Sequence, residues 1–338
     1  MPAPTQARRA APAARVLAWL CALALLPLLA WADRALSDHG ALGWERNAVR
    51  GGLAKLAKQP DASGVLLLGS STSRDFLRMA WLAAQFRVAP AEAVDGHING
   101  CHQGCTWAEV RRLLAEGRHF EVAVFGVNLL QMCEHAHSKR VLQHRLLLPR
   151  GETLSLWRHY LRAEAPLRYV ARSIFGAVSE TYADTTSVQT RLREALWDKP
   201  RRGQEHRWYR RDRPATTRIR TCDYEPDAVA YKLGLTAAIL DDLERLADRS
   251  YLLLLPDQSL SVEEPDVQQA WARHREAMAA LTEARPWVRL VDLTGDGPWT
   301  AERFRDGVHL SRRSYARQRR QLARELDRVD REAPGDRP

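Results

Sequence analysis

The chain has 338 residues, of which 45% are hydrophobic and 27% are charged, and its formal net charge is +10. This length allows one large or two modest domains, and this composition excludes a chain that is disordered over most of its length. The positive charge comes mainly from arginines that are spread along the sequence rather than gathered into one stripe, so we expect no nucleic-acid partner. The densest basic stretch, residues 191–220, is interpreted as a solvated or lipid-facing surface, or as a site for an anionic polymer.

A membrane-targeting segment opens the sequence. Three arginines among the first 15 residues precede an apolar run at residues 16–32. A positive flank followed by such a run is typical of a signal peptide or a short signal anchor. We expect residues 1–32 to form an uncleaved anchor, and cleavage at the small-x-small site that ends in Ala32 is the alternative. In both cases the rest of the chain lies outside the cytoplasm, on the periplasmic side of an inner membrane.

The cysteine content fits an oxidising compartment. One of the five cysteines, Cys21, lies in the apolar run, and the other four are Cys101, Cys105, Cys133 and Cys222. An even number of cysteines permits disulfides, although their connectivity does not follow from the sequence. We favour a bridge between Cys133 and Cys222, which would hold the long middle segment.

Strand-like and helix-like segments alternate along most of the chain. A helical stalk or linker is expected at residues 33–63, followed by a main domain at residues 64–330 and a polar tail at residues 331–338. Short apolar runs predict strands, and amphipathic segments between them predict helices. The strands are expected at residues 64–68, 93–99, 122–125, 251–255 and 288–293. Such alternation predicts an α/β fold with a mostly parallel sheet covered by helices on both faces.

The middle of the chain departs from this pattern. Residues 131–231 contain helical segments and the basic loop but no strand-like run, so they are expected to be an insertion into the main domain.

Three unusual turns follow predicted strands. They are Gly69-Ser70-Ser71 after the first strand, Gly126-x-Asn128 after the third, and Asp306-x-x-His309 near the end of the domain. Taken singly, each has a structural explanation, because serines cap helices and Asp-Gly turns are common. Ligand sites of parallel α/β sheets, however, lie at the carboxyl ends of the strands, where these turns fall.

Together and in this order, the three turns resemble the blocks of the SGNH (GDSL-type) hydrolase superfamily. The resemblance covers residues 64–128 and 251–322. It implies a three-layer α/β/α fold with a flavodoxin-like sheet. It also implies a catalytic triad with Ser71 as the nucleophile, His309 as the general base and Asp306 as the residue that orients the base. The donors of the oxyanion hole would be Ser71, Gly104 and Asn128. No cofactor or metal is implied.

One position departs from the family pattern. Ser70 stands where family esterases have aspartate before the nucleophile. The Gly-Ser-Ser variant is similar to membrane-anchored SGNH-like proteins, including the D-alanyl transfer protein of teichoic acid synthesis, that work with membrane-bound O-acyltransferases on cell-envelope polymers. The resemblance therefore implies a serine acyl-ester enzyme, an esterase or an O-acyltransferase, that acts on an envelope glycan and has a membrane-bound O-acyltransferase as its partner. In a transferase, residues 131–231 would form a lid that keeps water from the acyl-enzyme.

Two alternatives stay open at this stage. The first is a non-catalytic envelope protein that keeps the fold as a binding or scaffolding module. The second is a metal site, because His97, Cys101, His102 and Cys105 lie close together in the sequence. Their spacing is not one of the common zinc patterns, and the two cysteines are better explained as structural or as a local disulfide.

Overall fold

The computed structural model describes residues 48–99, 103–132, 158, 226–295, 298–306 and 308–332. The expected anchor at residues 1–32, the first part of the stalk and most of the insertion at residues 131–231 lie outside these residues. Among the helices that the structure describes, none has the length and apolar character needed to cross a membrane.

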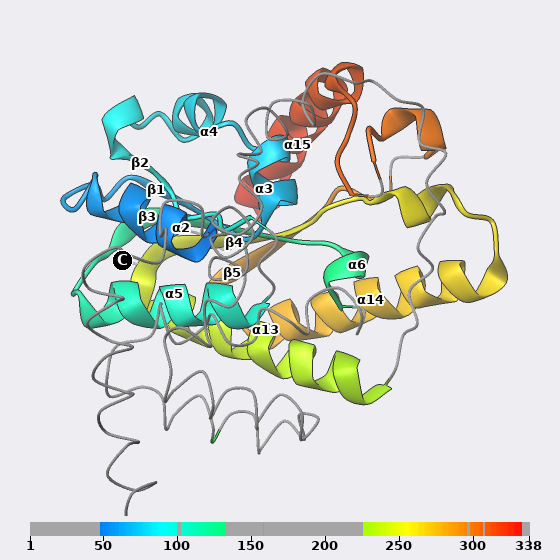
Figure 1. Cartoon of the computed structure of the whole chain (residues 1–338), viewed down its shortest axis with the longest axis horizontal. Coiled ribbons are helices and arrows are strands. Elements are labelled where there is room, and N and C mark those ends of the chain that lie inside the picture. Colours follow the sequence, from blue (N-terminus) through cyan, green and yellow to red (C-terminus); the bar gives the residue numbers. More distant parts are fainter. Residues whose placement is uncertain are drawn as a thin grey trace, which may run out of the picture.

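The core of the molecule is a sheet of five parallel strands, which confirms the predicted α/β class (Figure 1). The strands are β1 Val65–Leu68, β2 Ala93–Asp95, β3 Phe120–Val127, β4 Ala247–Leu254 and β5 Val288–Asp292. Their spatial order is β2-β1-β3-β4-β5. In this order the connection after β1 runs to one side, toward β2, and the connection after β3 runs to the other side, toward β4. The gap between the carboxyl ends of β1 and β3 is therefore the switch point at which such sheets bind ligands.

Strand β1 is apolar along its whole length because both of its faces are covered. All four residues of β1 have no exposed surface. Val65 and Leu67 face one hydrophobic cluster, and Leu66 and Leu68 face the other. A strand turns successive side chains to opposite faces, so an unbroken apolar run is what a strand between two helical layers requires.

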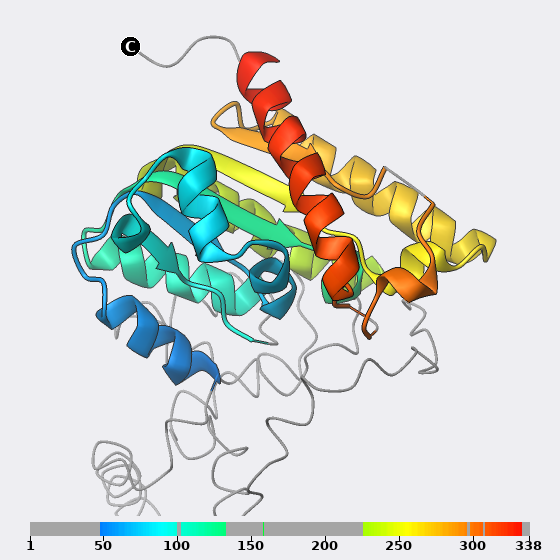
Figure 2. The same cartoon turned by 90° about the horizontal axis from the view of Figure 1, so that it is seen from above.

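Helices cover both faces of the sheet. One layer contains α3 Ser71–Phe76, α4 Met79–Phe86 and α15 Arg312–Glu332, and the other contains α5 Gln103–Ala115, α13 Pro226–Leu246 and α14 Pro265–Glu283 (Figure 1). Seen from above, α15 lies across the sheet beside α3 (Figure 2). It is held there by Tyr315, Leu322 and Leu326, which are buried at helical spacing. Each buried leucine contributes roughly 1.5–3 kcal/mol to the stability of the fold.

Several boundaries differ from the sequence predictions. Part of the expected stalk forms α2 Ala48–Ala57, and Leu56 of this helix is buried in the core. The second strand ends at Asp95 rather than at residue 99, because the Asp95 carboxylate accepts a hydrogen bond from the His97 N–H and so forms a turn. Backbone pairing continues beyond it, since Ile98 N donates to Gly69 O. The last helix runs to Glu332, into the expected tail.

In the part of the chain that the structure describes, four short helical segments lie between the main elements. They are η2 Pro90–Glu92, α6 Leu129–Met132, η5 Gln258–Ser261 and η6 Ala301–Arg303. Of these, α6 follows β3 directly and η6 comes shortly before the Asp306 turn, so both lie close in sequence to predicted site residues.

Candidate active site

The two turns that flank the switch point contact each other through a serine of α3. Gly69 has a φ of 119°, which favours glycine. A Cβ atom on Gly69 would lie 2.3 Å from Ser73 Oγ, and one on Gly126 would lie 2.4 Å from the same atom. Ser73 Oγ donates to the Gly126 carbonyl at 3.2 Å. Both motif glycines are therefore needed for the start of α3 to pack against β3.

A hydrogen-bonded chain joins Ser71, His309 and Asp306. His309 Nε2 lies 2.9 Å from Ser71 Oγ, and His309 Nδ1 lies 2.9 Å from both carboxylate oxygens of Asp306. An imidazole that donates from Nδ1 to a carboxylate keeps the lone pair of Nε2 for the serine hydroxyl. The structure thus brings together the three residues that the sequence predicted as nucleophile, base and orienting acid.

The Asp306 carboxylate is built to stay ionised. Its Oδ1 accepts backbone N–H bonds from Val308 at 3.0 Å and from His309 at 2.8 Å. Burial alone would raise the pKa of Asp306, but the hydrogen bond and charge of His309 and these backbone donors lower it to about 2. An ionised Asp306 stabilises the positive charge that His309 acquires when it takes a proton.

A second carboxylate, which the sequence analysis missed, lies beside the base. Asp75 Oδ2 is 3.9 Å from His309 Nε2. Two arginines hold this carboxylate: Arg74 at 3.0 Å and Arg305 at 3.2 Å. Asp75 follows Ser71 by four residues in α3, and this spacing puts both side chains on one helix face. That spacing was the available signal, but the arginine partners depend on the fold.

Asn128 caps α6 and presents an unpaired donor. Its Oδ1 accepts from Gln131 N at 3.0 Å, and Gln131 Oε1 accepts from Asn128 N at 3.2 Å. This reciprocal pair is a capping box. Because Oδ1 is committed to the cap, the side chain is fixed. Its Nδ2 is buried and has no hydrogen-bond partner among the described residues. A buried amide N–H without a partner is costly, and here it is available for an oxyanion.

Gln131 also ties this cap to the nucleophile turn. Gln131 Nε2 donates to Ser70 Oγ, which caps α3 by accepting from Thr72 N at 3.3 Å. The Gln131 carbonyl in turn accepts from Lys232 Nζ of α13 at 2.9 Å. Burial lowers the pKa of Lys232 to about 7. Ser70, which departs from the family pattern, is therefore a hydrogen-bonding link between the β1 and β3 turns.

Sequence reasoning missed the roles of Gln131 and Lys232. The pattern Asn-x-x-Gln at residues 128–131 is a capping signature that could have indicated the role of Gln131. Nothing in the sequence indicates the role of Lys232, because its contact with Gln131 joins residues about one hundred positions apart.

The sequence predicted Gly104 in a loop, but the residue lies in the first turn of α5. The amino end of α5, with Gly104 in its first turn, is therefore the part of this helix nearest in sequence to the loop that was expected to carry the oxyanion block. The neighbouring Gln103 reaches Met132 of α6, with its Nε2 at 3.0 Å from the sulfur atom. The amino end of α5 therefore packs against the segment that carries Asn128.

The metal alternative finds no support in the part of the chain that the structure describes. Cys105 is bonded in a disulfide and so offers no thiolate. The His97 ring contacts the Asp95 carboxylate and Lys55 Nζ. No group of three or more potential metal ligands occurs among the described residues. His102 and the other cysteines lie outside them.

Comparison of the chain with protein-family models and with curated proteins finds no match. The functional assignment therefore depends on the geometry above and on the motif resemblance. This geometry contains a hydroxyl beside an imidazole nitrogen, a carboxylate with a lowered pKa on the other ring nitrogen, and a buried amide donor at the next strand end. Such a set can activate an oxygen nucleophile for attack on an acyl carbon.

Proposed function

We propose that the protein is a serine-dependent acyl-ester enzyme of the SGNH type, either an esterase or an O-acyltransferase. The observation that carries the proposal is the continuous chain from Ser71 Oγ through His309 to Asp306, with 2.9 Å at each of its contacts. Asn128 Nδ2, which is buried at the adjacent strand end and has no partner within the described ranges, adds the donor that acyl transfer requires.

The reaction follows from the positions of these atoms. Ser71 Oγ attacks the acyl carbon while its proton moves to His309 Nε2, and the carbonyl oxygen becomes an oxyanion that accepts from Asn128 Nδ2. Collapse of this intermediate expels the alcohol, which takes the proton from His309, and leaves the acyl group on Ser71. Water or an acceptor hydroxyl then gives its proton to His309 and attacks the acyl carbon. The bond from this carbon to Ser71 Oγ breaks as His309 returns the proton to Oγ.

The cellular setting is part of the same proposal. The apolar run at residues 16–32 would hold the enzyme in the inner membrane with its α/β domain on the periplasmic side. The disulfide at Cys105 supports an oxidising compartment. The Gly-Ser-Ser turn favours an envelope glycan as acceptor and a membrane-bound O-acyltransferase as the partner that supplies the acyl group.

Labelling with a fluorophosphonate tests the proposal, because this probe reacts only with an activated serine. The full chain in detergent should be labelled, and labelling should be lost in both Ser71→Ala and His309→Ala. Ser261→Ala is the control, since it removes a hydroxyl that donates to the Gln258 carbonyl within η5 and contacts no triad residue. Folded wild type that stays unlabelled would contradict the proposal and favour the non-catalytic binding module.

A further inference from the structure

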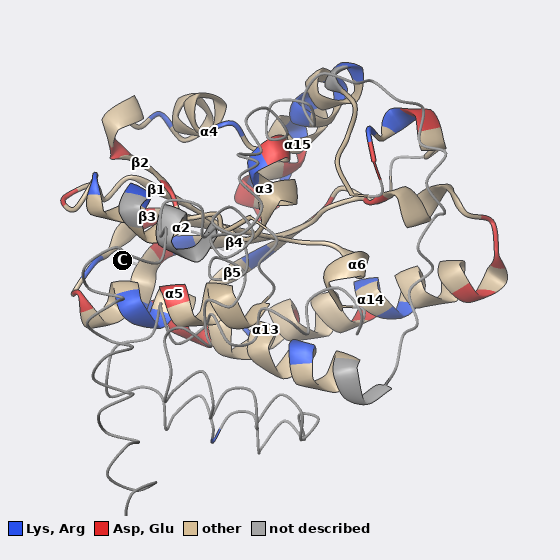
Figure 3. Ribbon diagram, in the orientation of Figure 1, with Lys and Arg blue, Asp and Glu red and all other residues tan. Residues whose placement is uncertain are grey.

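The outward face of α15 carries a row of arginines. Arg313, Arg317, Arg320 and Arg324 are all exposed. Their spacing of four, three and four residues places them on one side of the helix, opposite the buried Tyr315, Leu322 and Leu326. The row is about 16 Å long, from the helical rise of 1.5 Å per residue. We call these four residues the arginine row; Figure 3 shows basic residues along this helix.

This arrangement corrects the interpretation drawn from the sequence, in which the arginines formed no stripe. Between Arg312 and Arg324 the helix contains six arginines and no acidic residue. Among the described residues no carboxylate pairs with the row, whereas Arg328 further along α15 pairs with Glu325 and Glu332. The arginines in the first half of α15 therefore lack neighbouring carboxylates in the described part of the chain, whereas Arg328 in the second half is paired with them.

The row lowers the stability of the helix that carries it. Arginines three and four residues apart repel one another, and positive charges near the amino end of a helix oppose its macrodipole. Stability of the fold thus gives no reason for the row. A charge pattern that costs helix stability and stays exposed is expected where a negatively charged partner compensates it.

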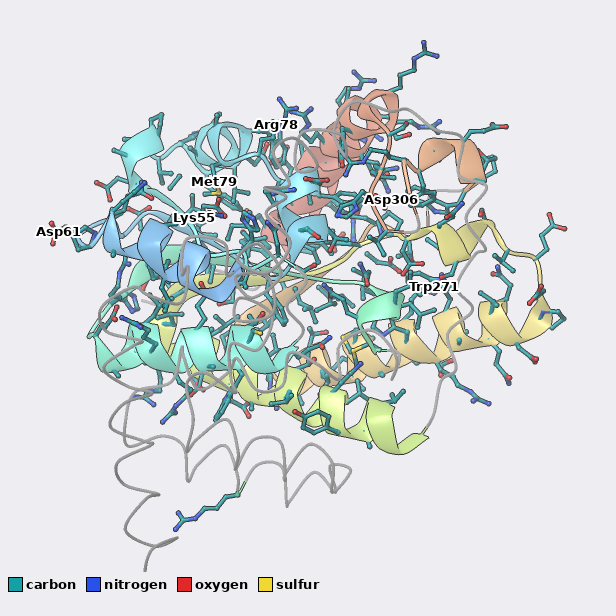
Figure 4. All side chains as sticks on the ribbon, viewed as in Figure 1. Lys55, Asp61, Arg78, Met79, Trp271 and Asp306 are labelled. Atoms are coloured by element: carbon teal, nitrogen blue, oxygen red, sulfur yellow. The ribbon has the colours of Figure 1, made fainter. Side chains whose placement is uncertain are left out.

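The row continues toward the triad. Arg303, in η6, is close enough to Arg317 that burial and the charge of Arg317 both lower its pKa. Arg303 Nη1 has no hydrogen-bond partner among the described residues, and the guanidinium lies over the Trp299 ring at 5.3 Å. Arg303 precedes Asp306 by three residues, so the positive surface leads from α15 to the segment that carries the orienting acid; Figure 4 labels Asp306 beside this helix.

We propose that the arginine row is a docking surface for an extended anionic polysaccharide that bears carboxylate or phosphate groups. A linear row fits a linear polymer with regularly spaced charges. A membrane surface fits less well, because interfacial helices bury tryptophan, phenylalanine or leucine in the lipid, and here those positions of α15 face the protein core. Single-stranded nucleic acid also fits less well, because the row has no exposed aromatic ring on which bases could stack.

Binding of fluorescent polygalacturonate tests this proposal on the full chain in neutral-lipid nanodiscs. A variant with all four row arginines changed to glutamine should bind about tenfold to a hundredfold more weakly than wild type. Wild-type affinity should also fall with added salt. The matched control changes Lys58, Arg112, Arg245 and Arg273 to glutamine, which removes the same charge from the opposite layer, where Arg112 is half-buried and the other three are exposed. This control should bind within about twofold of wild type.

Thermal unfolding separates lost binding from lost folding. Because the row repels itself, the glutamine variant should have a higher unfolding midpoint than wild type while binding more weakly. Equal losses of binding in the row variant and the control would overturn the proposal. Competition with unlabelled ligands gives a second test. If duplex DNA or phosphatidylglycerol vesicles displace the fluorescent polymer at a lower concentration of negative charge than unlabelled polygalacturonate does, the proposal is also overturned. The measurement contains no catalytic step, so its result is independent of the proposed acyl transfer.

Discussion

Two histidine–aspartate pairs lie at the carboxyl edge of the sheet, and only one is arranged as a catalytic base. His309 has Asp306 on Nδ1 and Ser71 on Nε2, and its side chain is 16% exposed. His97 has Asp95 on Nδ1, but its Nε2 lies 3.3 Å from Lys55 Nζ and its side chain is 1% exposed. Lys55 and Asp306 are well separated in Figure 4.

The difference shows what a carboxylate–imidazole pair needs in order to do chemistry. At His97 an ammonium group lies against the ring, 3.3 Å from Nε2 and 3.4 Å from Nδ1, and the side chain is almost completely buried, so the second ring nitrogen faces a cation instead of a hydroxyl. At His309 the same nitrogen faces a hydroxyl at the start of a helix, and the neighbouring strand end carries an amide donor that no described residue pairs with. The partner of Nε2 and access to solvent, rather than the pair itself, define the candidate active site.

The largest effect is expected at the two histidines. His309→Ala should lower kcat/KM for p-nitrophenyl acetate by about 10⁴-fold or more, because Ser71 loses its base. His97→Gln should leave kcat/KM within about threefold of wild type, since no reacting group contacts that ring. If His309→Ala and His97→Gln both fold and lose kcat/KM to a similar extent, the two histidine–aspartate pairs do not differ in catalytic role.

A smaller effect is expected at Asn128. Asn128→Ala should lower kcat by about 100- to 1000-fold with little change in KM, as for loss of one oxyanion donor. Asn128→Asp sharpens the test, because it keeps an oxygen to cap α6 but replaces the amide donor. It should be as impaired as the alanine variant, and activity near wild type in Asn128→Asp would mean that Asn128 only caps the helix.

Gln131 should act through Asn128. We expect Gln131→Leu to lower kcat by about tenfold, because the cap no longer holds the donor in place. In the Asn128→Ala background the same substitution should cost almost nothing, since the donor is already absent. Additive losses in this double-mutant cycle would show that Gln131 supports the fold rather than the position of Asn128.

The smallest effect concerns stability near His97. Glu109 is fully buried, neither of its carboxylate oxygens has a partner among the described residues, and burial followed by the charge of Asp95 raises its pKa well above 4.5. A carboxyl group with a raised folded-state pKa destabilises the fold increasingly as pH rises above the unfolded value. Glu109→Gln should therefore gain stability over wild type from pH 5 to pH 8 in urea unfolding. A constant difference across this range would contradict the raised pKa.

Much of the fold was predictable because the buried parallel strands contain short apolar runs. The runs at residues 64–68 and 251–255 overlap β1 and β4 for this reason. The end of the second strand was less predictable, because it depends on a side-chain turn at Asp95. Gly104 was expected in a loop, and the helix around it begins earlier than its apolar face suggests.

Some contacts of the candidate site were also predictable from the sequence, and others were not. The spacing of Asp306 and His309 already indicates one turn in which the two side chains meet, and the glycines at 69 and 126 mark close packing. The contacts of Gln131 with Ser70 and of Lys232 with Gln131 join distant parts of the chain through buried polar atoms. Hydrophobic periodicity carries no information about such contacts. The arginine row was missed for another reason, since uniform arginine content hides an alignment that appears only at helical spacing.

Trapping of the acyl-enzyme tests the central claim most directly. The full chain is mixed with p-nitrophenyl acetate, quenched in acid during turnover, digested and analysed by tandem mass spectrometry. We predict an acetyl group on Ser71, absent from Ser71→Ala, with Ser70 and Ser73 unmodified. Turnover of the ester with the acetyl group on another residue, or with no modification of Ser71 in folded protein, would contradict an acyl-enzyme mechanism at this serine.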